Sequence, residues 1–220
     1  MNQQNVNYQK ELDKLTAVLE KENIVPKLLL HSCCAPCSSY VLEYLSQFFE
    51  ITIFYYNPNI FPENEYEKRL TEQQELIADM QFKHPVSFQA GNYDKEKFYE
   101  MARGMEHLKE GRARCFKCYE MRLREAAEAA VKGGFDYFTT TLTISPMKNA
   151  GKLNSIGMET AAQYGVKYLP SDFKKRNGYK RSIELSKEYG LYRQDYCGCE
   201  FSKNERDLAK FSVDTNTSLW

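Results

Sequence analysis

The sequence predicts a single α/β domain, with a doubly wound, mostly parallel sheet and helices on both faces. Short β-branched or aromatic runs alternate with longer amphipathic patterns, which is typical of repeated strand–helix units. The chain has 220 residues, enough for one domain with a sizeable core, and it carries no internal repeat, low-complexity tract or linker. We expect one domain over 1–220, with a helical extension at 1–26, a core at 27–202 and a polar tail at 203–220.

The expected elements follow in a regular order. Apolar residues recur at helical spacing over 8–23, which predicts an amphipathic first helix. A short apolar run at 27–32 predicts a strand, and Ser38-Ser39 provide an N-cap signal for the helix after it. The run at 51–56 predicts a buried strand, and a polar helix is expected at 63–80. The remaining elements are expected as a strand at 86–89, helices near 94–108 and 118–132, a strand at 135–142, a helix at 151–164, a strand at 166–169 and a helix at 182–189.

Several polar or sulfur-bearing segments fall at the carboxyl ends of predicted strands. The carboxyl ends of parallel strands meet at one edge of a doubly wound sheet, where such folds place their functional loops. We therefore expect side chains from these segments to share that edge. The segments are Cys33–Cys37, Asn57-Pro58-Asn59, Thr139–Thr141 and Ser171-Asp172.

Composition and charge narrow the function classes. The 30 basic and 30 acidic residues balance, so the whole chain lacks the charge excess of a non-specific nucleic-acid binder. No stretch approaches the roughly 20 apolar residues that cross a bilayer, and the polar start of the chain does not resemble a signal peptide. We expect a cytoplasmic protein without membrane contacts. In a reducing cytosol, clustered cysteines favour metal-binding or catalytic roles over structural disulfides.

All seven cysteines lie in three tight groups, which is the strongest functional signal in the chain. The first group is Cys33, Cys34 and Cys37; the second is Cys115 and Cys118; the third is Cys197 and Cys199. Thiols this close together on turns can converge on one metal or exchange a disulfide. The first group follows a strand and precedes a helix, whose positive end favours the thiolate form that binds metals.

The first two groups together supply four sulfur ligands for a metal centre. The spacing of Cys115 and Cys118 is common to zinc ribbons and iron–sulfur proteins. Adjacent Cys33 and Cys34 cannot easily share one small tetrahedral ion, but they can bind two iron atoms of a cluster. We therefore expect an iron–sulfur cluster, with structural zinc as the alternative. Two buried thiols beside an accidental neighbour remain the plainer explanation of the first group.

The third group differs in kind, because Cys197 and Cys199 are separated by Gly198 alone. A disulfide between positions two apart closes a small strained ring, and strained disulfides are readily reduced. Such a pair suits electron transfer, and an additional pair of metal ligands is the alternative.

Other residues near the strand ends make weaker candidates. His31 is more typical of a packed core residue than of a metal ligand. The run Thr139–Thr141 can bond substrate hydroxyls but is also ordinary strand composition. Asp172 and Asp195 are candidate proton donors or metal ligands, although solvated carboxylates are the default.

Basic residues gather in three short segments, each of which can be a solvated face or a phosphate-binding patch. The patch around the second cysteine group is the best candidate, because it adjoins the expected metal centre. The segments contain Arg112, Arg114, Lys117, Arg122 and Arg124; Lys174, Lys175 and Arg176; and Lys180 and Arg181. A Gly-x-Gly-x-x-Gly motif and a Walker A loop are both missing, which disfavours ATP-dependent chemistry.

Five motifs in register resemble the cobalamin-independent epoxyqueuosine reductases of the QueH type, over about residues 27–202. They are His31-Ser-Cys-Cys-Ala-Pro-Cys37, Tyr56-Asn-Pro-Asn-Ile60, Arg114-Cys-Phe-Lys-Cys-Tyr-Glu-Met-Arg-Leu123, Phe138-Thr-Thr-Thr-Leu142 with Ser145-Pro-Met-Lys148, and Tyr192-Arg-Gln-Asp-Tyr-Cys-Gly-Cys-Glu-Phe-Ser202. The resemblance implies reduction of epoxyqueuosine to queuosine at the tRNA wobble position, the last step of queuosine biosynthesis. It also implies a HUP-like (nucleotide α-hydrolase-like) fold and a [4Fe-4S] cluster, with an additional iron ion beside it and no cobalamin.

Carried over by position, the resemblance implies roles for individual residues. Cys33, Cys34, Cys115 and Cys118 match the cluster cysteines, and Cys197 with Cys199 match a redox-active disulfide. Cys37 and Asp195 are our candidates for the additional iron, and Asp195 also for a catalytic role. The partners would be a tRNA carrying epoxyqueuosine and an external electron donor. We expect tRNA phosphate contacts from Arg112, Arg114, Arg122, Lys174, Lys175 and Arg176.

Two other function classes fit part of the pattern. A zinc-stabilised RNA-binding module would use the same four cysteines without turnover. A tRNA sulfurtransferase on a related fold would use cysteines to move sulfur but would need an ATP-binding loop. The metal content of the protein separates the first alternative from an iron–sulfur enzyme.

Overall fold

Five parallel strands form one sheet in the order β3-β2-β1-β4-β5. The computed structural model describes residues 6–217, with side chains described as far as residue 210. Chain order runs outward from β1 to β3 and then returns to the other side of β1 for β4. The switch point between β1 and β4 is where folds of this class place their ligands. The strands are β1 (Lys27–His31), β2 (Glu50–Tyr55), β3 (Val86–Ala90), β4 (Tyr137–Thr140) and β5 (Lys167–Tyr168).

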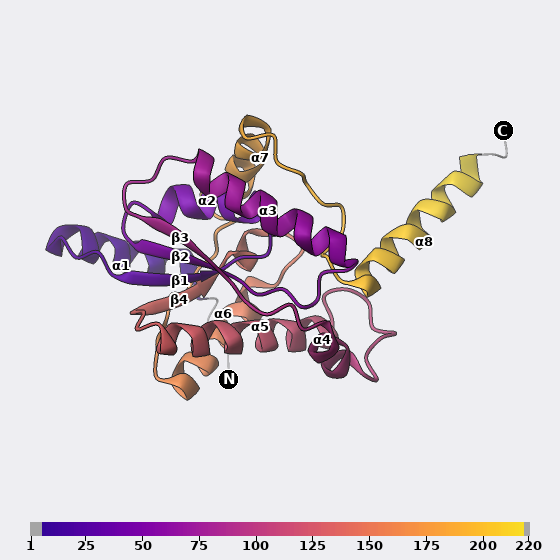
Figure 1. Ribbon diagram of the computed structural model, residues 1–220, viewed down its shortest axis with the longest axis horizontal. Coiled ribbons are helices and arrows are strands. Elements are labelled where there is room, and N and C mark those ends of the chain that lie inside the picture. The colour runs from indigo at the N-terminus through magenta and orange to yellow at the C-terminus, as the bar shows by residue number, and fades with distance from the viewer. Residues whose placement is uncertain (1–5, 218–220) are drawn as a thin grey trace.

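Helices cover both faces of the sheet, so the predicted doubly wound α/β class is confirmed (Figure 1). On one face Leu29 and Phe138 pack against α5 and α6; on the other Leu28 and Leu30 pack against α1 and α2. Alternate residues of β1 thus enter opposite cores, as a strand buried on both faces requires. The helices are α1 (Tyr8–Glu22), α2 (Ala35–Leu45), α3 (Glu63–Asp79), α4 (Lys95–Ala102), α5 (Ala113–Lys132), the 3-10 turn η1 (Thr141–Ile144), α6 (Ala150–Tyr164), α7 (Gly178–Glu188) and α8 (Glu200–Thr217).

Helix starts account for the main differences from the sequence prediction. The predicted N-cap at Ser38-Ser39 is wrong: Cys34 is the N-cap of α2, and Pro36 lies in the first turn, where its fixed φ favours helix initiation. Helix α5 begins at Ala113, five residues before the expected start. The polar segment at the C-terminal end forms α8, which was not predicted and which projects from the body (Figure 1).

Replacing Gly157 on α6 with alanine is expected to destabilise the fold. An ideal Cβ there would lie 2.3 Å from Cζ of the buried Tyr168 ring, so α6 would have to move away from β5. We expect the free energy of unfolding to fall by about 1–3 kcal/mol in urea denaturation. Gly151→Ala on the same helix is the control, since its Cβ meets nothing closer than 3.3 Å. Equal stability of the two variants would contradict this packing.

Candidate metal and redox site

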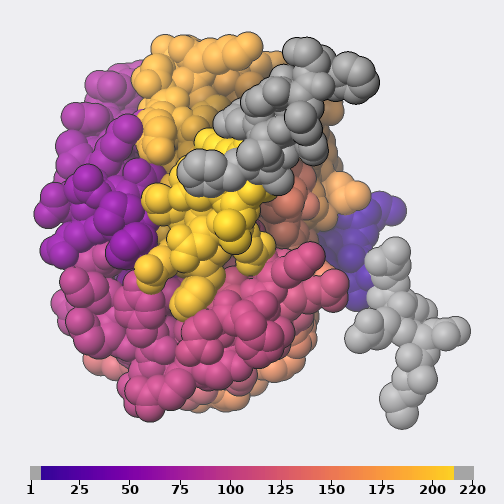
Figure 2. Space-filling view, turned by 90° about the vertical axis from the view of Figure 1, so that its right-hand side faces the viewer, coloured from indigo at the N-terminus to yellow at the C-terminus, as the bar shows by residue number. Residues whose placement is uncertain are grey.

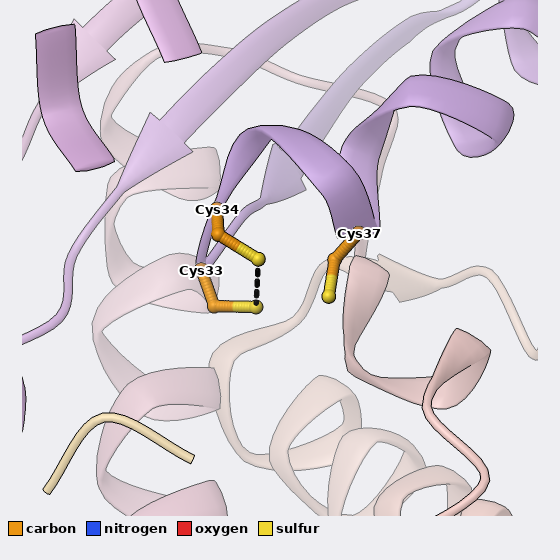
Figure 3. A group of neighbouring side chains, drawn as sticks. All are labelled: Cys33, Cys34 and Cys37. Atoms are coloured by element: carbon orange, nitrogen blue, oxygen red, sulfur yellow. Dashed lines mark hydrogen bonds between the residues drawn. The ribbon is translucent and has the colours of Figure 1, made fainter. Parts of the chain in front are cut away.

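The first cysteine group occupies the turn between β1 and α2. The strand delivers Cys33 to its carboxyl end, and the first turn of α2 carries Cys34 and Cys37 (Figure 3). The three sulfur atoms all lie within 4.8 Å of one another, and Sγ of Cys33 is 3.7 Å from Sγ of Cys34. Among the residues that the structure describes, this group meets the distance requirement for holding a metal ion.

The three thiols have unequal proton affinities because each is a neighbour of the other two. Interaction with Cys34, and then with Cys37, lowers the pKa of Cys33 well below its ordinary value. Contact with Cys33 raises the pKa of Cys34, and contacts with Cys33 and Cys34 raise that of Cys37. The group therefore carries one thiolate readily and resists losing further protons. A bound cation would remove that resistance, because metal ligation favours the deprotonated form.

Two amide side chains hold this turn in place: Asn57, from a segment expected at this edge, and Gln73, which the sequence analysis did not single out. Asn57 donates from Nδ2 to the carbonyl of Ser32 at 2.8 Å. Gln73 of α3 accepts from the hydroxyls of Ser32 and Ser38 at 2.7 and 2.8 Å. The turn is thus fixed to the end of β2 and to α3 on either side of the cysteines. Hydrogen-bonded support of this kind keeps ligand side chains in one orientation.

The second cysteine group lies on one face of α5. Cys115 and Cys118 are three residues apart, and Arg122 is four residues further along, so all three side chains fall on the same stripe of the helix. The thiol of Cys115 accepts from the backbone N–H of Gly111 at 3.2 Å. Burial raises the pKa values of Cys115 and Cys118. The spacing C-x-x-C-x-x-x-R on a helix is the signal that could have identified Arg122 as a neighbour of these cysteines instead of a phosphate contact.

The third cysteine group precedes α8. Cys197 and Cys199 are free thiols in this structure, and Cys199 is buried beside Ser202, with 3.5 Å between Sγ and Oγ. Gly198 has φ +123°, a conformation that side chains rarely tolerate, and its carbonyl accepts from the N–H of Phe61 at 2.8 Å. The glycine therefore fixes the path of the chain between the two thiols.

Two cavities connect the cysteine groups. The sulfur pocket, of about 260 Å³, is lined by the first cysteine group together with Cys197, Asp195 and Lys148. A smaller cavity of about 20 Å³ is lined by the second and third groups, so Cys197 borders both. Figure 2 shows the start of α8 (yellow), which follows the third group, in the middle of the face viewed there, below α7 (orange) and above the segment that precedes α5 (pink).

The predicted four-cysteine ligand set is divided between these cavities. Cys33 and Cys34 line the sulfur pocket, whereas Cys115 and Cys118 line the smaller cavity, which shares Cys197 with it. Cys33 nevertheless packs against the hydrophobic cluster that contains Cys115. Joint binding of one cluster by all four thiols stays a prediction. The three-sulfur group that the structure assembles instead includes Cys37.

Arg122 is a fully buried cation that lines the smaller cavity. It donates from Nε to His31 Nε2 at 3.2 Å and from Nη2 to Asn57 Oδ1 at 2.6 Å. His31 is neutral, because burial and then the Arg122 charge lower its pKa to about 3. No carboxylate pairs with Arg122 among the described residues, and the ionisable groups beside it are Cys118, Cys33 and Cys197. A buried cation of this kind suits an anionic sulfur site.

Arg122→Met is expected to destabilise the protein by about 2–4 kcal/mol, because it leaves buried acceptors on Asn57 and His31 without their donor. Urea unfolding under anaerobic conditions measures the change. Arg124→Met is the matched control: Arg124 is exposed on the same helix, and its loss is expected to cost less than about 0.5 kcal/mol. A similar unfolding midpoint and slope for both variants would contradict the role given to Arg122.

Other candidates from the strand ends take mainly structural positions. His31 bonds through Nδ1 to Thr140 at 2.9 Å, and Thr139 donates to the carbonyl of Leu169 at 2.8 Å. Thr141 alone of the three threonines approaches a sulfur, with Oγ1 4.0 Å from Sγ of Cys33. Asp172 pairs with Lys174. His31 is therefore a packed core residue, which the sequence analysis favoured over a metal ligand.

Asp195 lines the sulfur pocket, and its carboxylate forms ion pairs with Arg206 and with Lys210, the latter at 2.7 Å. The hydrogen bond from Lys210, and then that from Arg206, lowers the pKa of Asp195. The side chain is thus an ionised acceptor, suited to a cation rather than to proton donation. Its assignment to an additional iron stays a prediction.

The predicted phosphate contacts fall into two sets. Arg114 and Arg122 are only 1% and 2% exposed, so neither can reach the backbone of a docked tRNA, and that expectation is corrected. Arg114 instead donates to the carbonyls of Met105, Glu106 and Leu108, which closes the loop before α5. The other predicted contacts reach the surface to different degrees: Arg112 and Lys175 are exposed, Lys174 is half-buried against Asp172, and Arg176 pairs with Asp13 of α1.

The fold and the cysteine-lined cavities define a class: an α/β protein with a sulfur site at the switch point of its sheet, equipped for metal or redox chemistry. A family model described as epoxyqueuosine reductase QueH matches residues 28–205. The chain belongs to this family of oxidoreductases. Epoxyqueuosine reductase QueH of Staphylococcus epidermidis is 46% identical over an alignment covering all of this chain and 94% of the relative. The Streptococcus pyogenes protein of that name is 44% identical (98% and 86% covered), and the Thermotoga maritima protein 38% identical (81% and 91% covered).

Proposed function

We propose that this chain reduces epoxyqueuosine to queuosine at the wobble position of tRNA. The observation that carries the proposal is the convergence of cysteines from distant segments on one pocket, in a chain whose relatives are named for this reaction. No helix among the described residues is long and apolar enough to span a membrane.

The described residues fit an iron–sulfur cluster. Three sulfurs within 4.8 Å, four more thiols around the adjoining cavity and a buried Arg122 without a carboxylate partner all suit a soft, anionic centre. The buried Oδ1 of Asn59 lines the same cavity without a hydrogen-bond partner among the described residues. We propose Cys33, Cys34, Cys115 and Cys118 as the ligands of a [4Fe-4S] cluster, with Cys37 and Asp195 available to an additional iron. When bound, such a centre supplies electrons one at a time.

The remaining residues of the pocket would bind the nucleoside and exclude water. Removing the epoxide oxygen breaks two C–O bonds and forms one C=C bond. The reaction consumes two electrons from an external donor and two protons, and it releases water. Tyr196 encloses one side of the pocket, since its hydroxyl donates to the carbonyl of Phe61 at 2.8 Å and its ring lies against Arg69. Cys197 and Cys199 would exchange electrons as a dithiol and a disulfide.

The test is anaerobic incubation of the protein with tRNA that contains epoxyqueuosine, with dithionite as the reductant. Mass spectrometry of the digested nucleosides is expected to show loss of one oxygen atom and formation of queuosine. Unchanged epoxyqueuosine with an iron-loaded protein would contradict the proposal.

Arg112→Glu combined with Lys175→Glu is expected to weaken tRNA binding and flatten its salt dependence, because both are exposed basic residues among the predicted phosphate contacts. Each lost phosphate contact should reduce the slope of log K against log salt by about 0.7–0.9. Fluorescence anisotropy over a range of KCl concentrations measures both quantities. Lys132→Glu, at the opposite end of α5, is the control. An unchanged slope in the double variant would show that neither residue contacts the tRNA backbone.

A further inference from the structure

Lys148 lies in the loop that follows β4 and η1, next to the switch point of the sheet. A short turn holds the loop: the N–H of Lys148 donates to the carbonyl of Ser145 at 3.2 Å, and the N–H of Met147 donates to the hydroxyl of Ser145 at 3.3 Å. The turn brings the half-buried Lys148 to the wall of the sulfur pocket. The ionisable groups around it there are Cys197, Cys33, Tyr119 and Cys37.

Lys148 differs from the other cations that line this pocket. Arg69 is held by Glu65, with 2.6 Å between Nη2 and Oε1. Arg193 donates to the hydroxyl of Ser186 at 3.1 Å. For the side chain of Lys148, the described part of the chain offers no hydrogen bond and no carboxylate. Among the described cations that line this pocket, Lys148 is thus the one whose side chain has neither a recorded hydrogen bond nor an ion pair.

A cation without a carboxylate partner, in a pocket for a nucleoside whose epoxide carries no negative charge before it reacts, points to a charge that develops during the reaction. As the first C–O bond of an epoxide breaks, negative charge accumulates on the oxygen. A fixed ammonium stabilises that charge far more in an enclosed site than in water. Asp195 cannot do so, since it is ionised, and the thiols of the first group are weak hydrogen-bond donors.

We propose that Lys148 is a catalytic residue that donates a hydrogen bond to the departing epoxide oxygen. The inference rests on the proposed function and adds a residue to it. Two electrons from the external donor form the C=C bond as both C–O bonds break, and two protons from solvent convert the oxygen to water. Lys148 keeps its proton and provides positive charge throughout.

The test compares Lys148→Met and Lys148→Arg with a control, Lys152→Met, which removes an exposed lysine four residues away on α6. Iron content, the midpoint potential by anaerobic dithionite titration, and kcat and KM with epoxyqueuosine-containing tRNA are measured for each. We expect Lys148→Met to lower kcat about 100- to 1,000-fold, with iron content, potential and KM close to those of the unaltered protein. Lys148→Arg should recover part of the loss, because it restores a cation.

Two results would overturn the inference. One is Lys148→Met turning over as fast as Lys152→Met. The other is a loss of activity that is matched by lost iron or by a shifted potential, which would make Lys148 a counter-ion of the sulfur site. Failure of the unaltered, iron-loaded protein to turn over would instead reject the proposed function, so the two failures are distinguishable.

Discussion

Cys33→Ala protein, purified without oxygen, will be colourless and will not reduce epoxyqueuosine. Cys33 belongs to the three-sulfur group and is the thiol whose pKa its neighbours lower, so its loss removes the sulfur that gives up its proton most readily. Cys118→Ala, which removes a thiol that lines the smaller cavity, is expected to have the same effect. Visible absorption, iron content and turnover measure the outcome.

Met147→Ala serves as the control for these alanine variants, because Met147 lines the same pocket but is 74% exposed. It should retain iron in full. A coloured and active Cys33→Ala or Cys118→Ala protein would show that the sulfur in question is not a ligand.

Cys199→Ser is expected to retain iron and complete at most one turnover per reduced enzyme, with multiple turnover lost. Cys199 is buried and lies two residues from Cys197, which borders both cavities, so the pair can connect the sulfur pocket to an external reductant. Single-turnover and steady-state assays with equal iron loading separate the two steps.

The outcomes for Cys199→Ser distinguish the two roles predicted for the third group. Loss of iron would indicate that Cys197 and Cys199 are metal ligands. Unchanged steady-state turnover would exclude an obligatory redox exchange at Cys199.

Strand positions were predictable because their signal is local. The apolar run ending at His31 and the aromatic run ending at Tyr56 each lie within one short segment, and each fixed a carboxyl end of the sheet. The run at 135–142 predicted a third such end, and since parallel strands share one edge, the meeting of the first cysteine group with Thr141 was expected. The fold class and the neighbourhood of the site thus depended on short-range patterns.

Burial of charged side chains was not predictable in the same way. Arg114 and Arg122 belong to a basic segment that is typical of an exposed face, yet both lie inside. Their partners are acceptors elsewhere in the chain, such as Asn57, 65 residues before Arg122. Similarly, Gln73 supports Ser32 across 41 residues. Composition near a residue does not reveal partners that folding brings from a distance.

The account depends on iron held by sulfur at the switch point of the sheet. Iron and acid-labile sulfide analysis of the protein, purified without oxygen, tests that claim most directly. The expected result is about four iron and four sulfide per chain in a brown protein that dithionite bleaches, with room for one further iron. Stoichiometric zinc in a colourless protein, without sulfide, would contradict the account and favour a structural metal site.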